Sequence, residues 1–270
     1  MGLATQDSVF ALPRHPAADD RVVADALVVA GGGPAATAAV TLARLGVETF
    51  FVGAVGGDAV GDAIRTGLEV EGVDVSELAQ RAGARSPQSS ILVTAEGRAI
   101  VHFSGTAAPL EPSRRALELM REASWVHVDH AGFPAAPRDV RLSVDGGNPI
   151  PALDLAGVGL YAPTQAALER DFGSVEVALA AGAEIVVVTR GHEGCSGHTA
   201  KGSFDAPAMA LAEPVSTLGA GDVFHGALLA AFVHGSELPE ALAFANDCAA
   251  RSCRALDGRS AIPTLEEVRL

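Results

Sequence analysis

Residues 216–227 read Ser216-Thr217-Leu218-Gly219-Ala220-Gly221-Asp222-Val223-Phe224-His225-Gly226-Ala227, a glycine-rich turn that runs into an apolar segment. From Phe224 onward the apolar residues recur at helical spacing, which predicts a helix. Gly219 and Gly221 allow a sharp backbone turn and a close approach of a ligand to the amides. The first turn of a helix presents unpaired N–H groups and the positive end of the helix dipole, which together bind phosphate oxygens. The stretch therefore predicts an anion site at the start of a helix.

Asp222 lies in the first turn of that helix, beside the predicted anion site. A carboxylate in this place can accept the proton of a hydroxyl group that attacks phosphorus. The alternative is that Asp222 only balances the helix dipole, which contributes roughly 0.3–1 kcal/mol. The stretch by itself is compatible with both roles, so the rest of the chain must decide between them.

Composition narrows the classes of partner. The chain has 270 residues, with 33 acidic and 19 basic side chains and a formal net charge of −14. A nucleic-acid-binding protein normally carries a basic patch, and the sequence shows no such cluster, so we expect no nucleic-acid partner. Lys201 is the only lysine, and Gly202 follows it, whereas a Walker-type phosphate loop needs Gly-Lys-Ser/Thr.

The three cysteines, Cys195, Cys248 and Cys253, show no Cys-x-x-Cys spacing. We therefore expect reduced, mostly buried thiols in a cytoplasmic protein. The sequence shows no signal peptide and no apolar run long enough to span a bilayer, so no membrane association is predicted. No spacing of histidine and acidic residues suggests a metal site; His225 is read as a helix-surface or satisfied core residue, while His127 could touch substrate.

The first residues are unusual because the chain opens abruptly. Residues 2–7 read like the end of a strand and a turn, with nothing before them: either the true start lies upstream or the first strand is short. Residues 8–29 then mix short apolar runs with Pro13 and Pro16, which suggests irregular edge strands. Residues 89–94 and 99–103 flank a turn and predict a hairpin.

Farther along, predicted strands and helices alternate. Strands are expected at 47–55, 125–129, 141–144, 157–161 and 185–189, and helices at 35–45, 113–121, 165–170, 175–181 and 238–254. This order predicts an α/β fold with a mostly parallel central sheet covered by helices on both faces. Ligands bind at the carboxyl ends of such strands, where Asp7, Asp129, Asp145 and Thr189 are expected. We expect one domain over 1–270, with a small β lid from about 8–30 and 86–104.

Four motifs in this order resemble the PfkB/ribokinase family of ATP-dependent sugar kinases, over nearly the whole chain. They are Gly31-Gly32-Gly33 before an alanine-rich helix, residues 53–61 (GAVGGDAVG), residues 189–194 (TRGHEG) and residues 217–222 (TLGAGD). The resemblance implies a ribokinase-like fold. It also implies that Asp222 is the catalytic base and that the amides of Gly219, Ala220 and Gly221 form the anion hole.

The resemblance further implies where the sugar binds. Asp7 matches the acid that hydrogen-bonds sugar hydroxyls, and Gly31, Gly32 and Gly33 match the backbone turn that lies against the sugar. The residues themselves also allow a purely structural role without a ligand contact. A lone aspartate at a strand end is usually a turn residue, and a glycine run can merely cap a helix. Three consecutive glycines exceed what a cap needs, which favours a close approach of ligand.

For the nucleotide, the resemblance implies that Thr189, Gly191 and Gly194 form the loop beside ATP and that Asn246 forms part of the adenine wall. The alternatives are an ordinary tight turn for the loop and a solvated helix position for Asn246. The lid strands resemble those through which the family often dimerises, so a homodimer through the lid is expected.

The sequence is most similar to the branch that holds ketohexokinases and sulfofructose kinase. Gln88, in the stretch 86–89, and Arg21, in the lid, are the substrate-binding residues that this similarity adds. The position before Thr217 usually holds an acid and is Ser216 here, which puts activation by K⁺ in doubt. The family's Asn-x-x-Glu motif is not recognisable, so Mg²⁺ would depend on the nucleotide and water, with Asp145 as an indirect aid and no metal ligand assigned.

Together these observations predict a Mg²⁺- and ATP-dependent carbohydrate kinase that transfers the γ-phosphate to a hydroxymethyl group of a ketose-like sugar by general-base catalysis. One alternative is a nucleoside or other small-alcohol kinase of the same fold, although aromatic residues make up only 4% of the chain. Another is a sugar-binding sensor without turnover. Ser216 and the missing Asn-x-x-Glu motif favour the sensor, and the intact Asp222 stretch argues against it.

Overall fold

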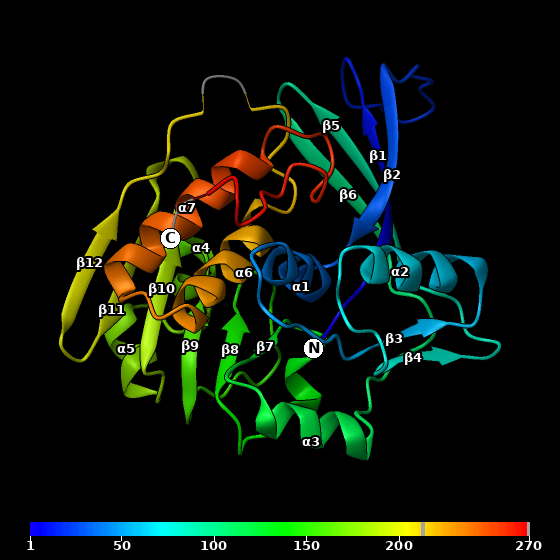
Figure 1. The fold of residues 1–270 in the computed structure, drawn as a ribbon. Coiled ribbons are helices and arrows are strands. Elements are labelled where there is room, and N and C mark those ends of the chain that lie inside the picture. The colour runs from blue at the N-terminus through cyan, green and yellow to red at the C-terminus, as the bar shows by residue number, and fades with distance from the viewer. Residues whose placement is uncertain (212–213, 269–270) are drawn as a thin grey trace.

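The computed structural model describes residues 1–211 and 214–268. Its strands form a six-stranded sheet, a four-stranded sheet beside it and a separate pair of strands. Helices cover the six-stranded sheet on both faces, and the four-stranded sheet stands above one edge of this layered body (Figure 1). Within the described residues, no helix combines the length and the apolar composition needed to cross a membrane.

The six-stranded sheet has the order β12-β11-β10-β9-β8-β7. Its strands are β7 (Val126–Val128), β8 (Leu142–Asp145), β9 (Val158–Ala162), β10 (Ile185–Thr189), β11 (Cys195–Thr199) and β12 (Gly202–Ala206). The first four are parallel, as the sequence predicts, whereas β11 and β12 form an antiparallel hairpin at the edge. The sequence analysis did not predict this hairpin.

Alternating side chains of the parallel strands belong to two apolar cores, one on each face of the sheet. Val187 belongs to one core, and its neighbours Val186 and Val188 belong to the other. The first core packs under α1 (Pro34–Arg44), α6 (Ala220–Val233) and α7 (Leu238–Ser252). The second packs under α3 (Arg114–Glu122), α4 (Gln165–Asp171) and α5 (Val175–Ala180). Burial on both faces explains the continuous apolar runs of these strands.

The helices begin at local capping signals. The side chains of Ser113, Thr164 and Ser174 accept the first backbone N–H groups of α3, α4 and α5. Pro34 starts α1, and Gly46 follows its end with φ 78°. The predicted helix starts and ends therefore agree with the structure to within a few residues.

The four-stranded sheet is the lid, with the order β2-β1-β5-β6. It is built from β1 (Thr5–Ala11), β2 (Ala26–Gly32), β5 (Gln88–Thr94) and β6 (Gly97–Phe103), and α2 (Ala59–Val70) packs beside it. The β5–β6 hairpin was predicted. Two regular strands, β1 and β2, replace the irregular edge strands expected over 8–29, because both prolines fall in the loop between them. Asp7 consequently lies inside β1, paired with Ala30 and Ser89, and not at a strand end as expected.

The remaining pair is β3 (Gly53–Gly56) with β4 (Leu78–Arg81), which run parallel. The strand predicted over 47–55 is thus much shorter in its regular part, although Phe50 forms an isolated bridge with Asp74. In the described part of the chain, β3 pairs only with β4, and β7 pairs only with β8.

Candidate active site

The start of α6 forms the centre of the site. Gly219 precedes the helix with φ 72°, and a Cβ added to it would lie 2.9 Å from the Gly258 backbone, so both the conformation and the packing require glycine here. A Cβ added to Gly221 would meet nothing within 4 Å. The space beside Gly221, in the first turn of α6, is therefore open, as an anion site at this helix start needs.

Asp222 lies in the first turn of α6 and is partly exposed. Its burial raises the pKa of its carboxyl well above the ordinary range, and the nearby charges of Asp145 and Asp129 raise it further, while Arg259 acts in the opposite direction. The side chain therefore adjoins the open glycine turn and is a carboxylate with increased affinity for a proton. This is the property that a general base uses.

Arg259 is the buried cation of the site, and the sequence analysis missed it. Its Nη2 donates to the carbonyl of Gly32 at 2.7 Å and its Nε donates to Thr37 Oγ1 at 3.2 Å. Burial lowers the pKa of this guanidinium to about 10, against the opposing charges of Asp7 and its other acidic neighbours. Thr37 and Arg259 are 222 positions apart, so only the fold brings them together.

The glycine run has a packing role that the sequence did not reveal. A Cβ at Gly31 would lie 2.2 Å from Arg259 Nη1, and a Cβ at Gly32 would lie 1.9 Å from Asp7 Oδ2. Gly33 has φ 91° and would clash with the Leu3 carbonyl. The glycines thus make room for Asp7 and Arg259, while the contact of this turn with a sugar remains a prediction.

Asp7 is buried and accepts a hydrogen bond from Thr5 Oγ1 at 2.7 Å. Burial raises the pKa of its carboxyl, and hydrogen bonds from Thr5 and Ser89 and the charge of Arg259 oppose that rise. A lid strand therefore carries an acid that lies close to a core arginine. This pairing places Asp7 at the junction between the lid and the six-stranded body.

Asp129 follows β7, as expected, but it is already fully hydrogen-bonded. Its two oxygens accept N–H groups from Leu3, Ala35, Ala131 and Gly132 at 2.8–3.2 Å. These bonds tie the start of the chain and the start of α1 to the end of β7. The structure therefore gives Asp129 a positioning role.

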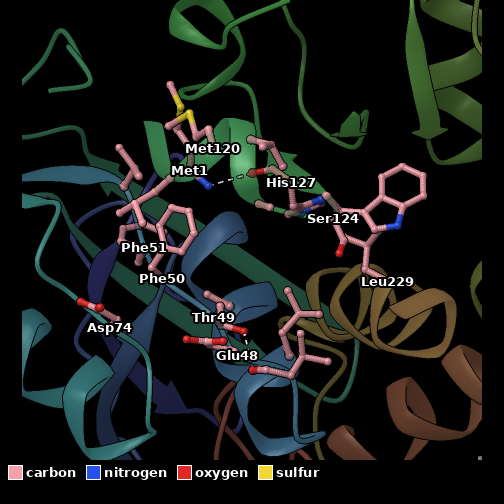
Figure 2. A pocket seen from close by; sticks show the side chains of 18 of the residues that line it. Met1, Glu48, Thr49, Phe50, Phe51, Asp74, Met120, Ser124, His127 and Leu229 are labelled. Atoms are coloured by element: carbon pink, nitrogen blue, oxygen red, sulfur yellow. Dashed lines mark hydrogen bonds between the residues drawn. The ribbon is translucent and has the colours of Figure 1, made fainter. Parts of the chain in front are cut away.

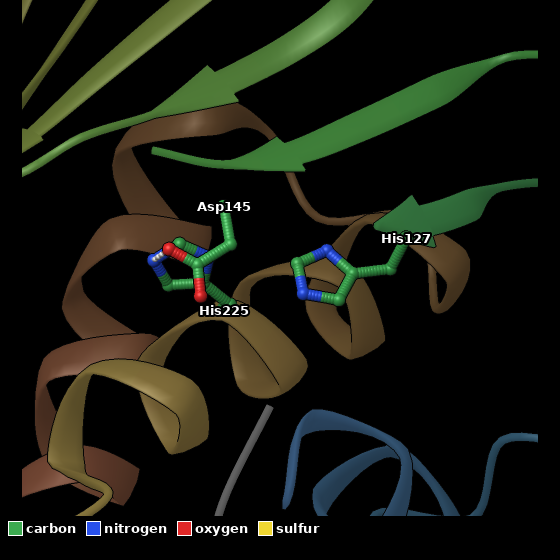
Figure 3. Close-up of side chains that lie close together, drawn as sticks. All are labelled: His127, Asp145 and His225. Atoms are coloured by element: carbon green, nitrogen blue, oxygen red, sulfur yellow. Dashed lines mark ion pairs between the residues drawn. The ribbon is translucent and has the colours of Figure 1, made fainter. Parts of the chain in front are cut away.

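His127, Asp145 and His225 form a buried cluster (Figure 3). His225 Nε2 lies 3.9 Å from Asp145 Oδ1, and His127 Nδ1 lies 3.0 Å from Ser143 Oγ. The other ring nitrogens, His127 Nε2 and His225 Nδ1, have no partner among the described residues. The expectation that His225 is a surface or satisfied core residue was therefore wrong.

The cluster consists of two imidazoles and one carboxylate, which are side chains that bind transition metals. Its candidate ligand atoms lie within 4.8 Å of one another. Imidazole nitrogens and a carboxylate oxygen this close to one another are the kind of ligand set that transition metals take.

The loop predicted to contact the nucleotide follows β10. The Thr189 N–H donates to the Pro163 carbonyl at 3.0 Å, and Gly191 and Gly194 have φ 57° and 95°. Asn246 Nδ2 donates to the carbonyls of Ala206 and Pro207, both at 3.0 Å. A Cβ at Gly194 would lie 2.2 Å from the Ala206 carbonyl, so Gly194 and Asn246 both pack against residues 206–207. An adenine contact of Asn246 remains a prediction.

The two substrate residues that were added from the lid lie away from Asp7. Arg21 is exposed in the loop between β1 and β2, which leaves β1 at Ala11, about 13 Å along the strand from Asp7. Gln88 pairs with Gln6, one position before Ser89, so its side chain points to the opposite face of the lid from Asp7. The structure does not bring either residue to Asp7, and their substrate contacts remain predictions.

The turn before α6 also contacts the lid. Arg98, at the tip of the β5–β6 hairpin, donates from Nη1 to Thr217 Oγ1 at 2.7 Å. Ser216, which replaces the acid expected before Thr217, is buried, and its Oγ accepts the Leu218 N–H at 3.1 Å. The lid therefore touches the glycine turn directly.

Comparison with known proteins agrees with this arrangement. Residues 1–141 and 164–265 match the family described as pfkB family carbohydrate kinase. The ribokinase of Bacillus subtilis (strain 168) is 27% identical over 286 residues, which cover 99% of this chain and 96% of that protein.

Solved structures show the same fold. The structure of Arabidopsis thaliana ribokinase complexed with ribose and ATP has a TM-score of 0.84 at 24% identity and covers 98% of this chain and 95% of that one. A putative ribokinase II from E. coli, in complex with ATP and Mg²⁺, has a TM-score of 0.81 at 20% identity, with coverage of 98% and 95%. The ribokinase-like α/β fold predicted from the sequence is confirmed.

Proposed function

Since the chain belongs to the pfkB family of carbohydrate kinases, we propose that Asp222 is the base through which it phosphorylates a hydroxymethyl group of a ketose-like sugar. The family establishes the coarser statement: the chain is an ATP-dependent sugar kinase, a phosphotransferase whose acceptor is a hydroxyl group. The ketohexokinase and sulfofructose kinase branch remains a prediction.

One observation carries the assignment of the base. Asp222 is the partly exposed carboxylate in the first turn of α6, where the space beside Gly221 is open. In the proposed step the sugar oxygen attacks the γ-phosphorus, its proton passes to the Asp222 carboxylate, and the bond from the γ-phosphorus to the oxygen of ADP breaks. The amides of residues 219–221 stabilise the charge on the transferring group. A positioned base typically contributes 10²–10⁴-fold to the rate.

ATP and Mg²⁺ enter this proposal through the related ribokinases whose structures contain them. The residues around Asp222 fit a Mg-nucleotide because the helix start can receive phosphate oxygens and the carboxylates supply negative charge for the cation. Mg²⁺ would neutralise phosphate charge when bound. Ser216 gives no carboxylate to a monovalent cation, so dependence on K⁺ is the least supported part of the proposal.

The homodimer through the lid is supported by the outer face of that sheet. The register places Leu27, Val29, Val101 and Phe103 on one face, and each is more than 40% exposed. An apolar sheet face of this kind suits burial against a second lid. Val101→Glu should therefore shift a dimer to monomer in sedimentation analysis; an unchanged dimer would place the interface elsewhere. A cytoplasmic location is supported by three free, buried cysteines.

A screen of ADP release with Mg-ATP over ketoses, aldoses, nucleosides and sulfonated sugars tests the function. Turnover with a ketose is the expected result. Turnover only with nucleosides would favour the nucleoside kinase alternative. Sugar binding in calorimetry without turnover on any acceptor would show the non-catalytic sensor instead.

A further inference from the structure

A small polar group lies inside the otherwise apolar layer between the six-stranded sheet and α6. His127 on β7 pairs with Ser143 on β8, and Asp145 follows two positions later on the same strand. Side chains alternate between the two faces of a strand, and the neighbours of these residues along β7 and β8 belong to the core under α3, α4 and α5. His127, Ser143 and Asp145 therefore face α6, which brings His225 against them (Figure 3).

Three members of this group combine deep burial with missing partners. His127, Asp145 and His225 are only 8%, 5% and 6% exposed. His225 Nε2 lies 3.9 Å from Asp145 Oδ1, which is too far for a hydrogen bond. His127 Nε2 and His225 Nδ1 have no hydrogen-bond partner in the part of the chain that the structure describes. Because burying such groups without a partner is costly, we expect a bound species to join them.

The hydrogen bonds that the cluster does make suit it to a cation. His127 Nδ1 lies 3.0 Å from Ser143 Oγ, and Asp145 Oδ1 accepts the Gly147 N–H at 2.8 Å. Histidines that bind metals usually donate their second ring N–H to a neighbour of this kind, which fixes the tautomer. With its proton on Nδ1, His127 offers the lone pair of Nε2. Within the described residues, the carboxylate of Asp145 has no cationic partner other than His225.

We propose that His127, Asp145 and His225 bind one divalent transition metal ion, such as Zn²⁺, between the sheet and α6. Their ligand atoms lie within 4.8 Å of one another, and small side-chain rotations would bring them to the distances of about 2.0–2.2 Å at which zinc binds. A water molecule would complete the four ligands that zinc usually takes. Mg²⁺ prefers oxygen ligands, so this site is distinct from that of the Mg²⁺ that accompanies the nucleotide.

The ion would join three elements of the fold. His127 lies on β7, Asp145 on β8 and His225 on α6, so the ion would hold the helix against both strands. Asp222 lies three positions before His225 and thus on the neighbouring turn of α6. The role proposed for the ion is to stabilise the helix that carries Asp222. It takes no part in phosphoryl transfer, and the proposal is independent of which acceptor the protein phosphorylates.

Titration of the metal-stripped full chain with Co²⁺, without nucleotide or sugar, tests the site. Co²⁺ takes the same ligands as Zn²⁺ and absorbs visible light when it is bound. We expect one Co²⁺ per chain, its displacement by Zn²⁺, and a rise of several degrees in the thermal midpoint with Zn²⁺. His127→Gln, Asp145→Asn and His225→Gln should each weaken Co²⁺ binding at least tenfold. The control is His198→Gln, on the β11–β12 hairpin, which should bind Co²⁺ as the unmodified chain does.

Two further measurements cover slow entry of the ion and a ligand variant that does not fold. The chain is also produced with Zn²⁺ in the growth medium, and mass spectrometry counts the metal retained after gel filtration. Ser143→Ala leaves the three ligands in place but removes the partner of His127 Nδ1, and it should weaken Co²⁺ binding about tenfold in a folded protein.

Three outcomes would overturn the proposal. The first is a chain that retains no metal by either route and whose thermal midpoint does not change with Zn²⁺, because water alone would then fill the cluster. The second is Co²⁺ binding of equal strength in every folded ligand variant, which would place the ion elsewhere. The third is Co²⁺ binding in Ser143→Ala equal to that of the unmodified chain, because His127 would then need no partner to hold its ring.

Discussion

The turn before α6 and a groove of about 520 Å³ between residues 48–52 and 124–127, beside β7 (Figure 2), are both open, but different parts of the chain line them. Around the turn, charged side chains dominate, with Asp222, Asp7 and Arg259 close together. Along the groove, backbone edges and apolar side chains dominate, and the carboxylates lie only at the rim. Single side chains should therefore control the chemistry of the turn, whereas backbone edges and apolar packing should control the groove.

The largest effect is expected at the turn. Asp222→Asn should lower turnover at least a hundredfold, because the attacking hydroxyl loses its proton acceptor, while calorimetry shows sugar binding nearly unchanged. ADP release measures the loss. Asp205→Asn, at an exposed carboxylate that pairs with Arg190, is the matched control and should retain activity. Unchanged turnover in Asp222→Asn would remove the base from the mechanism.

The same variant has a second expected outcome, which concerns stability. The folded protein raises the pKa of Asp222, so the protonated acid is favoured in the fold and the charged form is disfavoured at neutral pH. Asn carries no charge, and the free energy of unfolding should therefore rise in Asp222→Asn at pH 7. Denaturant titration checks this. A destabilised variant with the fold intact would show that the carboxylate contributes to stability.

The difference between the two regions also explains what could be predicted from sequence. Asp222 and Gly219 belong to one local turn, so their spacing is enough to indicate an anion site. Arg259 contacts Gly32 and Thr37 from the other end of the chain, and local sequence patterns do not indicate that contact. The β11–β12 hairpin was missed because Cys195–Thr199 mixes small and polar residues and lacks an apolar period.

The first residues of the chain show the same limit. The sequence could not show that Val52 and His127 flank those residues, because the flanking strands lie 50 and more than 120 positions away. The strand ends at Asp129 and Asp145 were predictable. Only the structure showed that four backbone N–H groups donate hydrogen bonds to the Asp129 carboxylate.

The second largest effect tests whether the charges around the turn depend on one another. Arg259→Gln should destabilise the protein by about 3 kcal/mol, since hydrogen bonds from a charged group to Gly32 and Thr37 are lost within the fold. Denaturant unfolding measures the loss, with the exposed Arg254→Gln as the control. Equal stability of the two variants would mean that the buried guanidinium is not needed to hold the turn together.

A smaller effect concerns the groove. The Met1 amine has a pKa of about 6 in the fold against an ordinary 8, so the uncharged amine is favoured in the folded state. The folding stability that the uncharged amine contributes is complete above pH 8 and is lost as the pH falls through 6. It amounts to at most about 2.7 kcal/mol. Unfolding at pH 8, 7 and 6 should show this loss in the free chain and not in the N-acetylated chain. Parallel pH profiles would show that the amine is not buried.

The smallest expected effect separates the two ligands at the turn. Asp7→Asn keeps the size that the cavity beside Gly32 requires but removes one acceptor and the charge. Lost hydrogen bonds from sugar hydroxyls should weaken sugar binding about tenfold, or roughly 1.4 kcal/mol, while ATP binding changes less than twofold. Calorimetry with each ligand measures the two constants. Because Asp7 lies on a lid strand and Asp222 on the core helix, a selective loss would assign the lid to sugar recognition, and equal losses would make Asp7 a structural partner of Arg259.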